Sequence, residues 1–119
     1  MTLDNMKKII LLIIFTMPFT CLGQLKIGSE LTVVHFNAGW NAANNVKWVG
    51  SLSDVKIKRC DIAKDVAATS KYEIVVVPTI IIFNNGKEIK RYQADISFSI
   101  KATKSEVQGK IDDVVMESF

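Results

Sequence analysis

Residues 31–44 read Leu-Thr-Val-Val-His-Phe-Asn-Ala-Gly-Trp-Asn-Ala-Ala-Asn, and this stretch decides the fold. Its first part, Leu31–Phe36, is apolar and rich in β-branched residues, which predicts a short strand covered on both faces. The next residues break that pattern. From Asn41 to about Ser51, apolar side chains recur at helical spacing, with Asn41 as the predicted N-cap. These apolar positions are Val46, Val49 and Leu52.

Further along the chain, the segment Val55–Ile62 predicts a second strand, because apolar residues alternate with lysines. Asp65–Tyr72 predicts a short helix. Val75–Phe83 is almost wholly apolar but contains Pro78, which cannot donate a hydrogen bond to a strand ladder. Either this strand begins at Thr79, or Pro78 sits at a specialised bend.

The last third of the chain predicts a hairpin and a helix. Asn84–Lys87 contains Asn-Gly, which tolerates the positive φ angles of a type I′ turn, and Lys87–Gln93 pairs back across it. Thr103–Glu106 has the pattern of a capping box that opens a final helix. Residues 94–102 either extend the hairpin or form a loop. The helix carries one apolar stripe, made of Val107, Ile111, Val114 and Val115.

The predicted order is therefore β-α-β-α-β-β-α. Two strands joined through a helix are expected to be parallel, and a hairpin is antiparallel. We thus expect an α/β fold with a central mixed sheet of about four strands and flanking helices.

This order and several local motifs resemble the thioredoxin family over about residues 31–117. Residues 33–40, Val-Val-His-Phe-Asn-Ala-Gly-Trp, are similar to the strand and loop ahead of the family's redox motif. Asp61-Ile62 resembles the end of the next strand, and Val77-Pro78-Thr79 resembles the family's cis-proline segment. Phe83–Lys87 matches its hairpin turn. The resemblance implies a thioredoxin fold.

The redox motif itself is replaced. Thioredoxins carry Cys-x-x-Cys directly after the tryptophan; one thiolate attacks and the second resolves the mixed disulfide. Here the tetrapeptide is Asn41-Ala42-Ala43-Asn44. A carboxamide has no sulfur to exchange and no proton that ionises near neutrality. We therefore expect no thiol–disulfide exchange at this position and assign it no catalytic residue.

Two nearby residues have a functional and a structural interpretation. Cys60 either is an exposed thiol that pairs with another protein, or is a small buried side chain, and the strand position favours burial. His35 matches the family's buried acid beneath the redox pair. With no thiol above it, a neutral histidine satisfied by a core hydrogen bond is favoured over a catalytic or pH-sensing role.

The resemblance also implies a peptide groove beside Asn41–Asn44. Trp40 either packs over the helix start or offers an aromatic surface to a ligand. A cis bond before Pro78 places the backbone groups of Val77 where an extended polypeptide can pair with them, as the family implies. These residues define a vestigial active-site face that can bind polypeptide without chemistry. The alternative is that the bend at Pro78 only shapes the sheet edge.

Residues 1–23 are interpreted as a secretory signal peptide, which leaves 24–119 as one domain. Lys7 and Lys8 precede the apolar run Ile9–Phe15, and cleavage after Gly23 would leave a periplasmic or secreted protein. An uncleaved membrane anchor and lipid modification of Cys21 are the alternatives. Contact with a membrane is expected only if the signal is uncleaved.

Charge and composition argue against several kinds of ligand. The 119 residues have a net charge of +3, which becomes +2 without residues 1–23. This small positive charge does not indicate a nucleic-acid-binding surface. One histidine and one remaining cysteine are too few for a typical structural zinc site. We expect no metal and no cofactor.

The sequence thus favours an exported, non-catalytic module that binds a polypeptide partner through the old active-site face. The first alternative is a thiol-disulfide oxidoreductase-related protein that acts through Cys60 alone. The second is a domain that forms homo-oligomers through a sheet edge or through residues 94–102.

Overall fold

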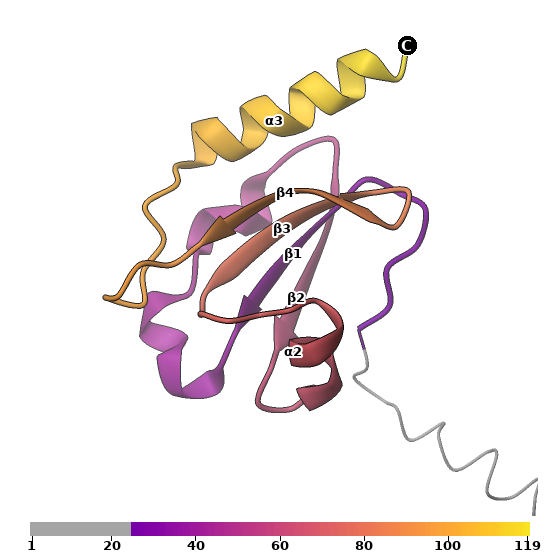
Figure 1. Ribbon diagram of the computed structural model, residues 1–119. Helices are drawn as coiled ribbons and strands as arrows, with labels where there is room; N and C mark the ends of the chain where they lie inside the picture. Colours follow the sequence, from indigo (N-terminus) through magenta and orange to yellow (C-terminus); the bar gives the residue numbers. More distant parts are fainter. Residues whose placement is uncertain (1–24) are drawn as a thin grey trace, which may run out of the picture.

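The structure is a computed structural model that describes residues 25–119. Figure 1 shows a sheet with helical segments around it. The elements in chain order are β1 (Thr32–Asn37), the 3-10 segments η2 (Gly39–Asn44) and η3 (Lys47–Ser51), β2 (Lys56–Asp61), α2 (Val66–Lys71), β3 (Thr79–Asn84), β4 (Lys87–Gln93) and α3 (Lys104–Glu117).

The four strands form one mixed sheet in the order β2-β1-β3-β4. β1 pairs with β2 in parallel, because η2 and η3 carry the chain back to the start of β2. β1 pairs with β3 antiparallel, and β3 pairs with β4 across the hairpin. The predicted fold class and strand arrangement are confirmed.

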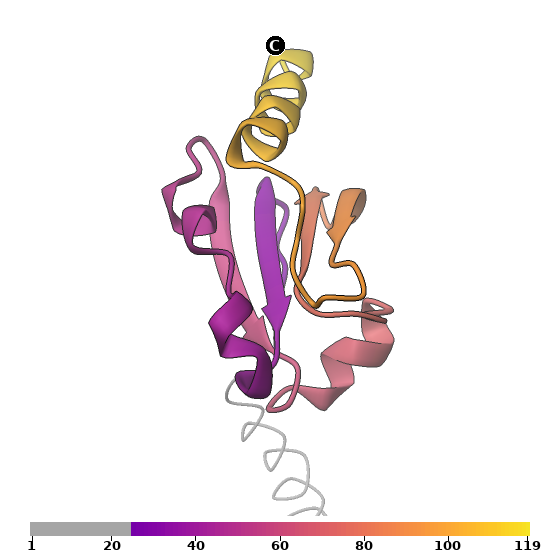
Figure 2. The same cartoon turned by 90° about the vertical axis from the view of Figure 1, so that its left-hand side faces the viewer.

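Alternate side chains of the central strands fill two separate cores, because neighbouring residues of a strand point to opposite faces. On one face, Val34 and Phe36 pack with Ile81 and with Ala68 of α2. On the other face lies a second cluster that receives side chains from the 3-10 segments and from α3, namely Val33, Val46, Val49, Leu52, Ile80, Ile82, Val107 and Ile111. Figure 2 shows the 3-10 segments and α2 on opposite sides of the sheet.

The hairpin between β3 and β4 has the predicted turn chemistry. Asn85 has φ of 55° and Gly86 has φ of 80°, which are the two positive values that a type I′ turn requires. At the other end of β3, the strand begins at Thr79, directly after Pro78, so the first of the two expected arrangements is present, and Pro78 also lies at a bend. The Val77–Pro78 peptide bond is cis.

The predicted C-terminal helix is present, with Thr103 at its N-cap. The Thr103 hydroxyl oxygen accepts a hydrogen bond from the backbone N–H of Glu106 at 3.2 Å. Val107, Ile111 and Val114 are buried as predicted. The stripe on α3 therefore anchors this helix on the sheet.

The helix predicted from Asn41 to Ser51 is wrong. Two 3-10 segments replace it, and the break lies at Asn45 and Val46, both of which have non-helical backbone angles. Val46 directs its N–H to the His35 side chain instead of to a helical carbonyl. Asn41 is not the N-cap, because Ala38 holds that place and Asn41 lies inside η2 with non-helical angles.

Within residues 25–119, no helix has both the length and the apolar character needed to cross a membrane. The predicted signal segment, residues 1–23, lies outside the described residues.

Candidate functional site

The site lies where β1 ends and η2 begins, and its centre is the side chain of Asn41. This residue is only 5% exposed. Its Nδ2 donates to Asn37 Oδ1 at 3.1 Å, to the carbonyl oxygen of Phe98 at 3.3 Å and, more weakly, to that of Val77 at 3.4 Å. Its Oδ1 accepts from Asn44 Nδ2 at 2.8 Å. Asn41, which the sequence resemblance aligned with the first cysteine of the thioredoxin motif, is therefore a buried carboxamide with every polar atom engaged.

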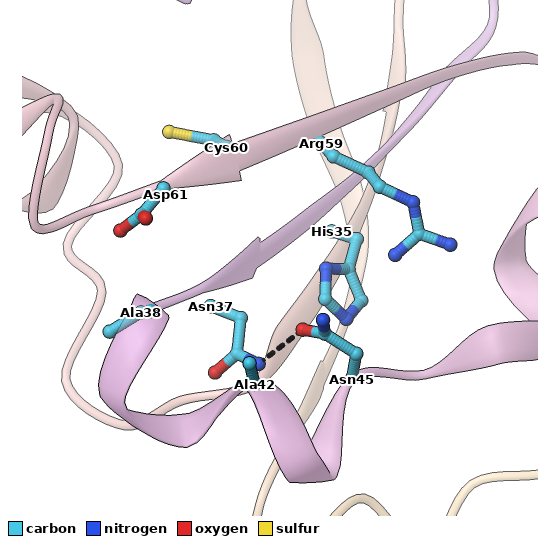
Figure 3. A pocket seen from close by; sticks show the side chains of 9 residues that line it. His35, Asn37, Ala38, Ala42, Asn45, Arg59, Cys60 and Asp61 are labelled. Atoms are coloured by element: carbon cyan, nitrogen blue, oxygen red, sulfur yellow. Dashed lines mark hydrogen bonds between the residues drawn. The ribbon is translucent and has the colours of Figure 1, made fainter.

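Asn37 and Asn45 extend this arrangement into a network of four carboxamides. Asn37 Nδ2 donates to the backbone carbonyl of Asn41 at 3.0 Å and to Asn45 Oδ1 (Figure 3). Asn37 is buried beside Asn41. Such a network satisfies buried polar groups and rigidifies the loop, but it offers neither a nucleophile nor a titratable proton.

Between Asn41 and Asn44 the tetrapeptide presents methyl groups to solvent. Ala42 and Ala43 are both exposed, whereas Asn44 is half-buried. The four residues therefore differ in role: the asparagines hold the loop, and the alanines form its surface.

An apolar pocket of about 140 Å³ lies beside this network. Trp40 is 69% exposed and its ring meets that of Phe98 edge-to-face, with 5.6 Å between centroids. Val75 is 76% exposed. The residues that line the pocket are Trp40, Ile62, Ile74, Val75, Val76, Val77 and Phe98. We call Trp40, Val75 and Phe98, with the pocket between them, the Trp40 face.

Val77 and Pro78 support this face from below. Both are buried, so neither side chain is an available contact for a ligand. The Val77 carbonyl, one of the backbone groups expected to pair with an extended ligand, already accepts a weak bond from Asn41 at 3.4 Å. The exposed residue of this segment is Val75, and sequence reasoning did not select it.

His35 is buried below the network, on the second face of the sheet. Its Nε2 accepts the backbone N–H of Val46 at 3.1 Å, so the ring is neutral and carries its proton on Nδ1. Burial, together with the nearby positive charge of Arg59, lowers the pKa of His35 to about 4. The imidazole therefore acts as a structural acceptor that positions η3.

A second cavity of about 330 Å³ lies between η2 and the edge strand β2 (Figure 3). Arg59 reaches across it, and its Nη2 donates to the Val46 carbonyl at 3.3 Å. The side chains around the cavity come from β1, η2 and β2, and include His35, Asn37, Asn45, Arg59 and Asp61.

Cys60 points away from the Arg59 side of β2 and into the core that contains Phe36 (Figure 3). It is 7% exposed, and among residues 25–119 it is a free cysteine. Burial, with the negative charges of Asp65 and Asp61, raises the pKa of its thiol to about 11. The thiol is therefore protonated at neutral pH and is a poor nucleophile.

The described residues contain no group of three or more histidine, cysteine or acidic side chains that could hold a metal ion.

Sequence reasoning missed Phe98, Asn37 and Asn45 as parts of the site. Four asparagines within residues 37–45 are a signal for a carboxamide network that the sequence does contain. Phe98 gave no such signal. It reaches Trp40 only because residues 95–99 form a tight loop in which Phe98 has φ of 59° and Asp95 binds Ser97.

Comparison with known proteins places this geometry in a family. The sequence model of thioredoxin matches residues 24–103. No curated protein matches the chain. Among solved structures, *Schistosoma mansoni* thioredoxin is 22% identical with a TM-score of 0.58, covering 74% of this chain and 80% of that one. *Thermosipho africanus* thioredoxin 1 is 20% identical with a TM-score of 0.55, covering 73% and 97%.

A third similar structure is *Fasciola hepatica* thioredoxin, at 24% identity and a TM-score of 0.51, covering 72% of this chain and 82% of that one. At these identities the structural likeness establishes the fold, and the match over residues 24–103 establishes the family. The chain belongs to the thioredoxin family.

Proposed function

We propose that this protein is an exported, non-catalytic thioredoxin-family module that binds an extended polypeptide through the Trp40 face. The observation that carries the proposal is the pairing of two features. A carboxamide network fills the redox position, and an open apolar pocket lies directly beside it.

The chemistry of the network supports binding in place of exchange. Disulfide exchange requires a thiolate that attacks a sulfur and a second thiol that resolves the intermediate. Asn41 and Asn44 supply neither group. The single-cysteine alternative finds less support, because Cys60 lies in the core on the far side of β2 from Arg59 and its pKa is raised.

The Trp40 face supports an apolar side chain as the main contact of the partner. Trp40 and Val75 are large apolar residues that remain mostly exposed, and such residues mark interaction sites when they adjoin a pocket. A volume of about 140 Å³ suits one aliphatic or aromatic side chain. The Val77 carbonyl accepts one weak bond from Asn41 at 3.4 Å and keeps a second lone pair for the ligand backbone.

The test is a nuclear magnetic resonance titration with an unfolded, S-carboxymethylated polypeptide, which contains no thiol. We expect shifts at Trp40, Val75 and Phe98 in the native protein. A Trp40→Ala/Val75→Asp variant should lose them, because the change removes the aromatic wall and places a charge at the pocket. Met116→Asp, which alters an equally exposed apolar residue on α3, is the matched control and should bind normally.

Equal binding by the native and Trp40→Ala/Val75→Asp proteins would show that the ligand sits elsewhere. The absence of catalysis is tested separately, by measuring the reduction of insulin by dithiothreitol in the presence of the protein. We expect no rate above the background reaction. Clear turnover would refute the non-catalytic assignment.

Export is the third part of the proposal and rests on Lys7, Lys8 and the apolar run Ile9–Phe15. N-terminal sequencing of the protein recovered outside the cytoplasm should give Gln24 as the first residue. A protein that retains residues 1–23 would instead support membrane anchoring.

A further inference from the structure

The outer edge of β2 has no strand beside it within residues 25–119. In the sheet formed by the described residues, β2 is the terminal strand and pairs only with β1. The N–H groups of Lys56 and Ile62 donate toward β1, to the carbonyls of Leu31 and Asn37. Because backbone groups alternate in direction along a strand, the N–H and C=O groups of Ile57 and Arg59 point to the open side.

This edge is strongly basic. Lys56, Lys58 and Arg59 lie within four consecutive residues. Lys56 has a loose ion pair with Glu30 at 3.7 Å, and both side chains are largely exposed. Lys58 donates to the backbone carbonyl of Lys26 and Arg59 to that of Val46, so neither has a carboxylate partner among the described residues. Most of the positive charge on this edge is therefore not neutralised.

The opposite edge of the sheet, β4, also carries three basic residues, Lys87, Lys90 and Arg91, but there the arginine is paired with a carboxylate. On β4, Arg91 is bound by both carboxylate oxygens of Glu88, at 2.7 and 3.0 Å. The same guanidinium also donates to the carbonyls of Tyr72 and Glu73. The arginine of β4 is thus saturated, while that of β2 has one long hydrogen bond.

A cavity adjoins the open edge on the side of the sheet where Arg59 lies. It measures about 330 Å³ and is lined by Arg59, Asp61 and Asn45 (Figure 3). An added strand would place every second side chain on this side of the sheet. The cavity therefore offers space for a side chain next to the Arg59 guanidinium.

We propose that the outer edge of β2 is a strand-addition site for an acidic extended segment of another polypeptide. The ligand backbone pairs with the outward groups of Ile57 and Arg59, and its carboxylates neutralise Lys56, Lys58 and Arg59. Charge argues against a second copy as the occupant, because two β2 edges would bring like charges together. This site is separate from the Trp40 face and goes beyond the proposed function.

The test is amide hydrogen exchange of the exported protein, with two blocked peptides as probes. One has Glu at two of every three positions and Thr at the third, so that carboxylates lie on both faces of the added strand. The other has Lys in place of each Glu. In the free protein, the Ile57 and Arg59 amides should exchange fast while those of Lys58 and Cys60 are protected by β1. The acidic peptide should protect Ile57 and Arg59, and the basic peptide should not.

Charge reversal supplies the matched comparison. Lys58→Glu/Arg59→Glu should weaken binding of the acidic peptide by about tenfold or more, because attraction becomes repulsion. Lys87→Glu/Lys90→Glu makes the same change on β4 and should leave the affinity within about twofold. In both variants without peptide, the backbone amides at positions 58 and 60 should be as well protected from exchange as in the native protein, which would show that the sheet is intact.

Four results would overturn the proposal. The first is no added protection at Ile57 and Arg59 with the acidic peptide. The second is equal binding of both peptides. The third is equal loss of binding in the β2 and β4 variants. The fourth is protection of the same amides that grows with protein concentration and accompanies dimerisation, which would identify a second copy as the occupant. If the Trp40 face turned out to bind no polypeptide, the proposed function would fail, but protection of Ile57 and Arg59 by the acidic peptide would still support the site on β2.

Discussion

At the residue scale, Asn41 has the most consequential side chain of the site, since it serves four hydrogen-bond partners from a buried position. In Asn41→Ala, the acceptors on Asn37, Val77 and Phe98 would lose their donor. We expect the free energy of unfolding to fall by about 1–3 kcal/mol. Urea denaturation measures it. Asn44→Ala, which removes one bond from a half-buried side chain, is the control and should cost about 1 kcal/mol or less.

His35 makes stability depend on pH. Its pKa is about 4 in the fold against 6.5 as the ordinary value, so the unfolded chain takes up the proton first. The stabilisation that neutral His35 contributes to the free energy of unfolding is therefore complete above pH 6.5 and is lost as the pH falls from 6.5 towards 4. The slope is at most about 1.4 kcal/mol per pH unit. His35→Gln should remove this part of the slope; parallel denaturation curves for the two proteins between pH 7 and 4.5 would contradict the prediction.

Cys60 gives a direct test of the single-thiol alternative. Because the thiol is buried and its pKa is raised to about 11, labelling by a thiol reagent at neutral pH should be slow in the folded protein and fast in denaturant. A Cys60→Ser/Ser105→Cys variant places the only described thiol on an exposed site of α3 and should label quickly. Fast labelling of native Cys60 would revive a redox role.

At the scale of elements, the strands and the hairpin follow from local sequence, and the first helix does not. β-branched runs and Asn85-Gly86 act through their own backbone preferences. By contrast, Val46, Val49 and Leu52 at helical spacing fit a 3-10 segment as well as an α-helix. The choice depends on His35, which is distant in sequence and draws the Val46 N–H out of the helical pattern.

Two glycines should respond to the same substitution with opposite signs. Gly86 has φ of 80°, so Gly86→Ala should lower the free energy of unfolding by about 1 kcal/mol, although nothing crowds the added methyl group. Gly109 lies inside α3 in open space, so Gly109→Ala should raise it by about 0.5–1 kcal/mol. Thermal unfolding of both variants checks the pair, and a gain for Gly86→Ala would contradict the turn assignment.

At the scale of the whole molecule, the sheet and the position of the site were predictable because the thioredoxin motifs are local and ordered along the chain. Asn41 and Trp40 could be placed at the end of β1 from sequence alone. The Trp40–Phe98 contact could not, since residues 95–99 have no periodic pattern and their loop depends on hydrogen bonds among Asp95, Ser97 and Ser99. The two cavities likewise depend on how separate elements meet.

The Asn41 side chain also has a consequence for binding energy. Its hydrogen bonds reach the end of β1, the segment before β3 and the loop after β4, so one carboxamide of η2 is joined to three separate parts of the chain. A ligand at the Trp40 face therefore meets loops that are already ordered. These loops lose their conformational entropy when the protein folds, so ordering them does not reduce the affinity for a ligand. Under the proposed function, the residues that resemble the redox motif of thioredoxins would serve to preorganise a binding surface.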